Sequence, residues 1–271
     1  MASYLFANVA VLYGICMRYF LQLSYQGTRY SGWQRQQNAQ GVQDVVEEKL
    51  GKVLQYPVWT TGCGRTDAGV HARTYFLHFD TPQPLPASFL SIINKNLPDD
   101  IAVQAAFEVS EDCHARYSAV ERAYDYHLHT IKTPAIGQQS TWLDGSGFPL
   151  DVDAMQLAAD ALLRYNDFRG FCKAPDRHKT TLCVIREARL YSDAEGQHIR
   201  FHIRGNRFLR GMVRLIMAQL IRVGQHQLTP QAFEELLATQ TRPTFFIFAP
   251  PQGLHLVDVV YPQGCMGERV M

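Results

Sequence analysis

The sequence predicts an α+β fold of two lobes, and three observations support this prediction. A chain of 271 residues is long enough to bury one large core or two smaller ones. Hydrophobic residues make up 46% of the chain and charged residues 19%, a balance typical of a globular protein rather than a disordered one. Both halves alternate short strand patterns with short helix patterns, and no repeat of fixed short period is visible.

The elements expected in the first half follow the periodicity of the apolar residues. Residues 18–25 alternate apolar and polar positions, which indicates a strand, and 41–54 place their apolar residues on one helical face. In chain order we expect a strand at 18–25, a helix at 41–54, strands near 56–62 and at 73–80, a helix at about 86–96 with Pro86 in its first turn, and a strand near 101–108.

The second half repeats this pattern at similar lengths. In chain order we expect a strand at 121–131, a helix at 151–165, strands at 181–192 and 197–204 in a hairpin around Glu195 and Gly196, a helix at 206–222 with Gly224 as its C-cap, a last helix opened by Thr229 and Pro230, and a strand at 254–261. Residues 81–86 and 132–150 are expected loops, the second long enough to be functional. These lengths are typical of ferredoxin-like lobes.

A local excess of positive charge predicts a polyanionic partner. The net charge is +1, but residues 164–222 hold 13 Arg or Lys against 5 Asp or Glu. Of the 26 basic residues in the chain, 20 are Arg, whose planar guanidinium binds phosphate in two places and stacks on bases. We therefore expect this basic block, residues 164–222, to bind nucleic acid. The alternative is a solvated surface balanced by acidic neighbours.

The six cysteines and the N-terminal segment indicate a reduced, intracellular setting. No two cysteines form a C-x-x-C pair, so we expect buried thiols and no metal site. Residues 1–16 are uncharged and apolar, but they lack the basic start of a secretory signal and are too short to span a bilayer. We expect 1–16 to be a dispensable extension and the protein to be cytoplasmic, with no membrane partner.

A glycine-rich loop at 62–71 carries the residues best suited to chemistry. Three glycines bracket Arg65 and Asp67 between two expected strands. The loop is neither a phosphate-binding Walker loop nor a dinucleotide fingerprint. A carboxylate beside a guanidinium stays ionised and can act as a nucleophile or a base. The alternative is a turn in which Asp67 caps local amides and Arg65 is solvated.

This loop resembles the signature of a known family. Residues 64–72 (Gly-Arg-Thr-Asp-Ala-Gly-Val-His-Ala) are similar to the catalytic motif of the tRNA pseudouridine synthase A family. Further segments similar to the family lie at 25–34, 96–101, 115–124, 206–214 and 251–256. The resemblance covers about 18–262 and implies a pseudouridine synthase fold, in which two ferredoxin-like lobes share a largely antiparallel central sheet. We expect an N-terminal lobe at 17–115, a C-terminal lobe at 116–262 and a tail at 263–271.

The resemblance also implies an activity. The family isomerises uridine to pseudouridine at positions 38, 39 and 40 of the tRNA anticodon stem-loop, without a cofactor, as a homodimer. The implied site residues are Asp67 as catalytic nucleophile or base, Arg65 and Arg214 supporting it, Tyr124 and Leu254 binding the target uracil, and Arg204, Arg207 and Arg210 binding tRNA phosphates.

The sequence differs from the family at three places, and it leaves three other functions open. Tyr117 stands where Phe is usual, Ala218 where Gly is usual, and 242–248 (Arg-Pro-Thr-Phe-Phe-Ile-Phe) replace a smaller Gly- and Ala-rich segment. The chain could modify another RNA, or bind RNA without catalysis, although Asp67 and its flanking residues are intact. A glycosidase-like hydrolase needs a second positioned acid, and the 62–71 loop offers only Asp67.

Overall fold

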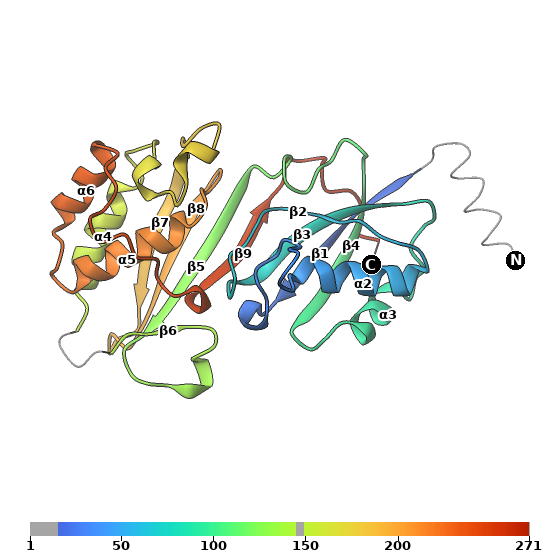
Figure 1. Cartoon of the computed structure of the whole chain (residues 1–271), viewed down its shortest axis with the longest axis horizontal. Coiled ribbons are helices and arrows are strands. Elements are labelled where there is room, and N and C mark those ends of the chain that lie inside the picture. Colours follow the sequence, from blue (N-terminus) through green and yellow to red (C-terminus); the bar gives the residue numbers. More distant parts are fainter. Residues whose placement is uncertain (1–15, 145–148, 271) are drawn as a thin grey trace, which may run out of the picture. The chain divides into compact units, whose positions relative to one another are not determined.

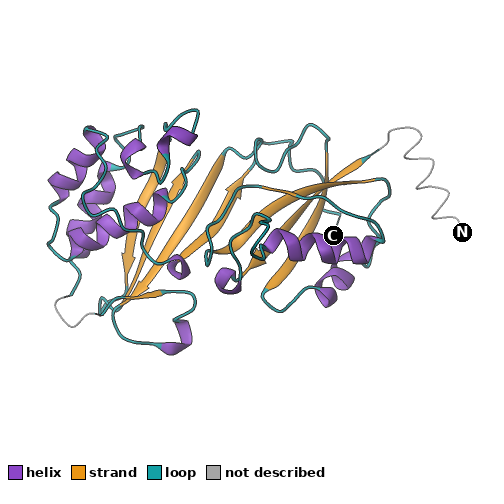
Figure 2. Ribbon diagram, in the orientation of Figure 1, coloured by secondary structure: helices purple, strands orange, loops and turns teal. Residues whose placement is uncertain are grey.

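The protein is described from a computed structural model that covers residues 16–144 and 149–270. The chain divides into two compact units, one formed by the described residues up to Val120 together with 258–270, the other by 121–257. Each unit contains strands and helices, which confirms the α+β class (Figure 2). All of the expected extension except Cys16 lies outside the described residues.

Three long strands form the sheet of the first unit. They are β1 (Met17–Tyr25), β3 (His71–Thr81) and β4 (Ile101–Val109), in the antiparallel order β4-β1-β3. Central β1 pairs Leu21 with Leu77 on one side and with Ala106 on the other, so its apolar residues are buried.

The strand expected near 56–62 is reduced to a short edge. Only β2 (Thr61–Gly62) pairs with β3, opposite its residues Leu77 and His78. Pro57 has no N–H to donate to a sheet, and the side chain of Trp59 is 71% exposed. The chain therefore joins the sheet only just before the loop that carries Asp67.

Two helices complete the first unit, α2 (Val42–Leu54) and α3 (Phe89–Asn96), which pack against each other (Figure 1). Helix α2 begins after Gly41, whose N–H donates to the carboxylate of Asp44 at 2.9 Å. Helix α3 begins later than expected, because the carbonyl of Pro86 accepts from the N–H of Phe89 in a preceding turn. Pro86 therefore lies before the helix.

The second unit is built on a three-stranded antiparallel sheet. Its order is β5-β8-β7, formed by β5 (Glu121–His129), β7 (Ile185–Ser192) and β8 (His198–Gly205), while β6 (Thr141–Trp142) pairs in parallel with β5. The expected hairpin turn is confirmed, with Gly196 at φ 68°. Strand β7 starts later than expected, because backbone groups of Thr181 and Cys183 bond to Phe168 and Asn166 instead of to β8.

Helices α4 (Val152–Ala161), α5 (Met212–Gly224) and α6 (Pro230–Ala238) pack together, with α4 against β7 (Figure 1). The expected start of α6 is confirmed, because the Thr229 hydroxyl accepts from the N–H of Ala232. The expected start of α5 at 206 is wrong. Gly211 adopts φ 74°, a left-handed conformation that a helix cannot contain, so the helix begins at Met212. Gly224 ends α5 as its last helical residue instead of capping it.

The last described residues, 258–270, belong to the first unit. Strand β9 (Leu254–Val260) is followed by a tail that runs along β4, where Val270 donates its N–H to the carbonyl of Ala106 at 2.9 Å. In the same tail the carbonyl of Cys265 accepts from the thiol of Cys113 at 3.2 Å. Five of the six cysteines are buried and Cys16 is exposed, which agrees with the sequence prediction.

Candidate functional site

The loop that carries Asp67 connects β2 to β3 and is held by the segment that follows β1. Gly69 donates its N–H to the carbonyl of Tyr30 at 3.2 Å, and Trp33 donates its N–H to the carbonyl of Thr66 at 3.4 Å. Within the loop, the N–H of Val70 closes a turn on the carbonyl of Asp67 at 3.2 Å. Asp67 itself is half-buried. The backbone on both sides of this carboxylate is therefore fixed by main-chain hydrogen bonds.

Buried aromatic residues of the first unit pack against the same loop. The hydroxyls of Tyr25 and Thr66 lie 2.9 Å apart, and Tyr75 donates its hydroxyl to the carbonyl of Gly64 at 2.5 Å. The rings of Trp33 and Tyr75 stack with centroids 4.2 Å apart. Burial raises the pKa of Tyr75 well above its ordinary value, so its hydroxyl keeps the proton it donates.

Three glycines allow the backbone to approach this closely. Gly32 has φ 88°, and a Cβ at that position would overlap the carbonyl oxygen of Thr66. A Cβ at Gly62 would overlap the hydroxyl of Tyr75 and the indole of Trp33. By contrast, a Cβ at Gly64 would meet nothing within 4 Å. Gly27 is placed in the same way at the far end of the loop, where a Cβ would overlap the carbonyl oxygen of Val70.

Arg65 is exposed but oriented by a chain of side-chain hydrogen bonds. Its Nε donates to Oε1 of Gln34 at 3.2 Å, and Gln34 donates to Oε1 of Gln43 at 2.7 Å. Gln43 donates in turn to Glu47 at 3.0 Å. Glu47 is buried and also accepts from the N–H and the hydroxyl of Thr60. The sequence prediction named Arg65 but not the glutamines behind it.

Tyr124 and Leu254 belong to two strands. On β5, Tyr124 is half-buried and pairs with Ile203 of β8. Its ring meets that of Phe208 edge to face, with centroids 5.1 Å apart. Leu254 opens β9 and is 6% exposed, so it is buried. Phe208 lies in the 206–211 loop before α5, and this loop was expected to be helix.

Arg214 lies in the first turn of α5 and is half-buried. Its Nε donates to the carbonyl of Ala249 at 2.7 Å, and the N–H of Ala249 donates to the carbonyl of Arg214 at 3.1 Å. The guanidinium carbon lies 5.7 Å from the ring centroid of Phe248. The start of α5 and the end of the unusual 242–248 segment are therefore fixed to each other.

A cation lies near each of the three aromatic rings in 242–248. Phe248 is approached by Lys173 as well as by Arg214, Phe245 by Arg222 at 5.0 Å, and Phe246 by Arg242 at 4.0 Å. The carbonyl of Phe245 also accepts from the side-chain amide of Gln219 at 2.8 Å. The segment has no acidic residue, and Phe245 and Ile247 are about half-exposed. It presents an aromatic and basic surface.

The basic block divides into two kinds of arginine. At least six of its eleven arginines lie within ion-pair distance of a carboxylate: Arg164, Arg169, Arg186, Arg189, Arg200 and Arg204. Arg207, half-buried, and Arg210, exposed, have no carboxylate partner among the described residues. The expected phosphate-binding role is therefore best supported for Arg207 and Arg210, and less so for Arg204, which lies 3.9 Å from Glu121.

Within 16–144 and 149–270, no group of three or more His, Cys, Asp or Glu side chains is placed to hold a metal ion. In the same residues, no helix is both long and apolar enough to span a bilayer.

Comparison with known proteins places the chain in a family. The family model described as tRNA pseudouridine synthase matches residues 23–118 and 158–262, which include every expected site residue except Tyr124. A protein of Porphyromonas gingivalis named tRNA pseudouridine synthase A is 40% identical over 252 residues, covering 90% of this chain and 97% of its own length. One from Idiomarina loihiensis with the same name is 41% identical over 249 residues, covering 91% and 94%.

Proposed function

The chain belongs to the tRNA pseudouridine synthase family, and we propose that it isomerises uridine to pseudouridine at positions 38, 39 and 40 of the tRNA anticodon stem-loop. The observation that carries the proposal is the Asp67 loop, which lies within the matched residues and has its backbone fixed from both sides. The similarity to enzymes of that name extends over about nine-tenths of the chain.

The reaction breaks the N1–C1′ glycosidic bond of uridine and joins C5 to C1′, while the proton on C5 is transferred to N1. The target base has to leave its stack before a side chain can reach it, at a cost of a few kcal/mol. We assign Asp67 to the reacting sugar, where it either attacks C1′ or removes the C2′ proton. Both routes require the carboxylate to be ionised and held still, and the Asp67 loop provides a fixed backbone for it.

The other site residues take supporting roles in this proposal. Tyr124 offers a ring face to the flipped uracil, since base–aromatic stacking contributes about 1–3 kcal/mol. Arg65 and Arg214 supply positive charge that favours an ionised aspartate, and Leu254 supplies an apolar surface for the base. Arg204, Arg207 and Arg210 bind phosphates of the tRNA backbone. We also propose that the protein acts on tRNA in the cytoplasm and that it does so as a homodimer. Gel filtration with light scattering would test the homodimer.

Replacing Asp67 tests the catalytic assignment. Asp67→Asn keeps the size of the side chain but removes its charge, so we expect tRNA affinity to stay near that of wild type while pseudouridine formation disappears. The measurement is pseudouridine mapping in purified tRNA beside a binding titration. Asp112→Asn, at an exposed aspartate of the same unit, is the matched control and should retain full activity. Turnover by Asp67→Asn near that of wild type would rule the assignment out.

Pseudouridine mapping, extended from purified tRNA to total RNA, separates the remaining alternatives. A wild-type protein that binds tRNA but forms no pseudouridine would be an RNA-binding protein without catalysis. A paralogue with a different target would modify another RNA, which mapping in total RNA from cells with and without the gene would reveal. Both outcomes contradict the proposed reaction in tRNA, and the mapping in total RNA tells them apart.

A further inference from the structure

One segment of the second unit, residues 242–248 between α6 and β9, exposes large apolar side chains. Phe245 is 48% exposed and Ile247 is 51% exposed, and the segment contains no acidic residue. Single exposed apolar side chains are common on proteins, but two that lie two positions apart in one short segment can be covered together by one partner. Removing their apolar area from water would then favour binding.

The backbone that carries these two side chains is held by hydrogen bonds to α5. The carbonyl of Phe245 accepts from the side-chain amide of Gln219, a buried residue of that helix, at 2.8 Å. Directly after the segment, the N–H of Ala249 donates to the carbonyl of Arg214 at 3.1 Å. A surface that is already held in one conformation loses less entropy when it binds a partner.

Three cations lie beside the aromatic rings of the segment. The distances from cation to ring centroid are 4.0 Å for Arg242 and Phe246, 5.0 Å for Arg222 and Phe245, and 5.8 Å for Lys173 and Phe248. In the part of the chain that the structure describes, none of the three cations has a carboxylate within ion-pair distance. The guanidinium of Arg222 donates instead to neutral oxygens of Gln219 and Gln227. An aromatic ring does not neutralise a cation, so the positive charge of the segment remains available to a partner.

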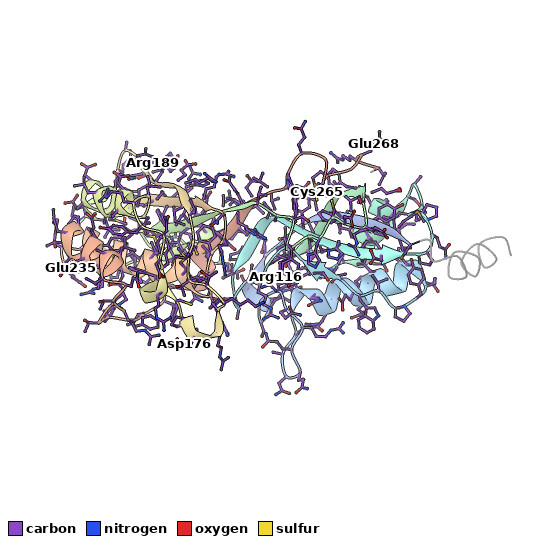
Figure 3. The ribbon with its side chains drawn as sticks, turned by 90° about the horizontal axis from the view of Figure 1, so that it is seen from above. Arg116, Asp176, Arg189, Glu235, Cys265 and Glu268 are labelled. Atoms are coloured by element: carbon purple, nitrogen blue, oxygen red, sulfur yellow. The ribbon has the colours of Figure 1, made fainter. Side chains whose placement is uncertain are left out.

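The positive charge continues from this segment to the loop before α5. Lys173 donates its backbone N–H to the carbonyl of Arg210 at 3.1 Å, and both side chains are exposed. Asp176, labelled on the second unit in Figure 3, is the acidic residue nearest to Lys173 in the sequence. Its carboxylate lies 2.5 Å from Arg169, so it is already paired. The aromatic–basic surface, as we call this area, consists of Lys173, Arg210, Arg222, Arg242, Phe245 and Ile247.

This combination of charge and exposed apolar side chains matches unpaired nucleotides. Phosphates are attracted to the cations, and an unstacked base offers a flat face that packs against an aromatic side chain. Bases inside a duplex are stacked on one another, so their faces are covered. A second copy of this chain docked here across a two-fold axis would bring the same cations together, and they would repel each other. The surface therefore favours a single-stranded part of a nucleic acid.

We propose that the aromatic–basic surface binds an unpaired nucleotide of the RNA substrate, with its base against Phe245 and Ile247 and its phosphates near Arg222 and Arg242. The inference rests on the proposed function for the identity of the RNA. It assigns a role in substrate choice to 242–248, the segment in which this chain replaces the smaller residues usual in the family. The contact is therefore a feature of this chain and lies outside the shared reaction.

The first test separates stacking from charge at this surface. Phe245→Ala should weaken binding of a tRNA anticodon stem-loop about tenfold without changing the salt dependence, because the variant removes a ring and no charge. Phe245→Tyr keeps the ring and should bind as tightly as wild type. Arg242→Ala should reduce the slope of log K against log salt by about 0.7, the contribution of one phosphate contact in a single strand.

The matched control for Phe245→Ala is Leu157→Ala, at a 64% exposed leucine of α4 in the same unit. It removes exposed apolar area away from the aromatic–basic surface and should leave the affinity for the stem-loop unchanged. Wild-type affinity in Phe245→Ala, or a wild-type slope in Arg242→Ala, would overturn the proposal.

The second test asks whether the bound nucleotide is unpaired. The stem-loop and a fully paired RNA duplex of equal length are each titrated with wild type and with Phe245→Ala. We expect the substitution to weaken binding of the stem-loop only, because the duplex has no free base face to lose. An equal loss for the two RNAs would show that paired RNA occupies the surface, which contradicts the proposal.

A different partner and a failure of the proposed function would each give a distinct result. If Phe245→Ala splits an oligomer of the protein in light scattering and leaves the affinity for the stem-loop unchanged, the surface binds a second copy of the chain and the proposal is wrong. Absence of pseudouridine formation in wild type would contradict the proposed function. The titrations would still show whether the surface binds RNA, because binding does not require turnover.

Discussion

At the scale of single residues, the position of Asp67 depends on small neighbours that leave no room for a side chain. Gly62 ends β2 with its backbone against the Tyr75 hydroxyl and the Trp33 ring, and Gly32 brings its segment against the carbonyl of Thr66. The contacts of Gly32 with Thr66 and of Gly62 with Trp33 each join residues about 30 positions apart in the chain. The contact of Gly62 with Tyr75 lies where β2 pairs with β3. A methyl group at either glycine would displace the Asp67 loop from its support.

Gly62 and Gly64 form a matched pair for testing this dependence. We expect Gly62→Ala to lower the free energy of unfolding by about 1–3 kcal/mol, because the added methyl group overpacks a buried site. Gly64→Ala, two residues later, meets open space and should leave stability unchanged within about 0.5 kcal/mol. Urea denaturation of both variants measures the difference. Equal destabilisation of the two would contradict the packing described for Gly62.

At the scale of elements, β3 is buried along most of its length and therefore holds its histidines away from water. His78 is 7% exposed, and its Nδ1 accepts the backbone N–H of Ala115 at 3.1 Å. Burial, followed by the nearby charges of Arg18 and His114, lowers the pKa of His78 from 6.5 to about 4. The folded strand thus needs this ring neutral.

This requirement predicts how stability depends on pH. The unfolded chain binds a proton at His78 more tightly than the folded chain does, so stability is fully present above pH 6.5 and is lost as the pH falls toward about 4. The loss from this residue is about 3 kcal/mol. Denaturation at a series of pH values measures it. His78→Asn, which keeps an acceptor for the Ala115 N–H but cannot be protonated, should show a shallower dependence; an unchanged slope would assign the effect elsewhere.

At the scale of the whole molecule, the excess charge of the basic block is reduced by ion pairs. Arg200 lies 3.2 Å from the buried carboxylate of Asp125, and Arg189 lies 3.8 Å from Asp160. Burial of Asp125 raises the pKa of its carboxyl group, but hydrogen bonds from His202 and Arg200 outweigh this effect and keep the pKa below its ordinary value. Such arginines are already neutralised by the protein, so fewer of them remain to displace the counterions of an RNA.

The two kinds of arginine should therefore differ in their effect on RNA binding. We expect Arg207 and Arg210 changed together to Ala to weaken tRNA binding and to reduce the slope of log K against log salt by roughly 1–2, since each phosphate contact contributes about 0.7–0.9. Arg164 and Arg189 changed together to Ala remove the same charge from ion-paired positions and should leave that slope nearly unchanged. Equal slopes for the two double variants would place the tRNA surface elsewhere.

The sequence by itself determined the α+β class, the order of the main strands and helices, and the loop that carries Asp67. These features depend on interactions within a few residues: apolar periods of two or about 3.6, a capping Thr229, and glycines that surround Asp67. The family resemblance on 64–72 was readable for the same reason, because a loop motif is contiguous in the chain.

Only the tertiary structure decided which distant residues meet. Arg65 bonds to Gln34 across 31 positions and Arg200 to Asp125 across 75, and no local pattern predicts such pairs. The same holds for the cations on the rings of 242–248. Element ends followed this rule too, since α5 could begin only after the left-handed Gly211, where a Cβ would overlap the ring of Phe248. Local periodicity selects elements, whereas long-range packing selects their bounds and their partners.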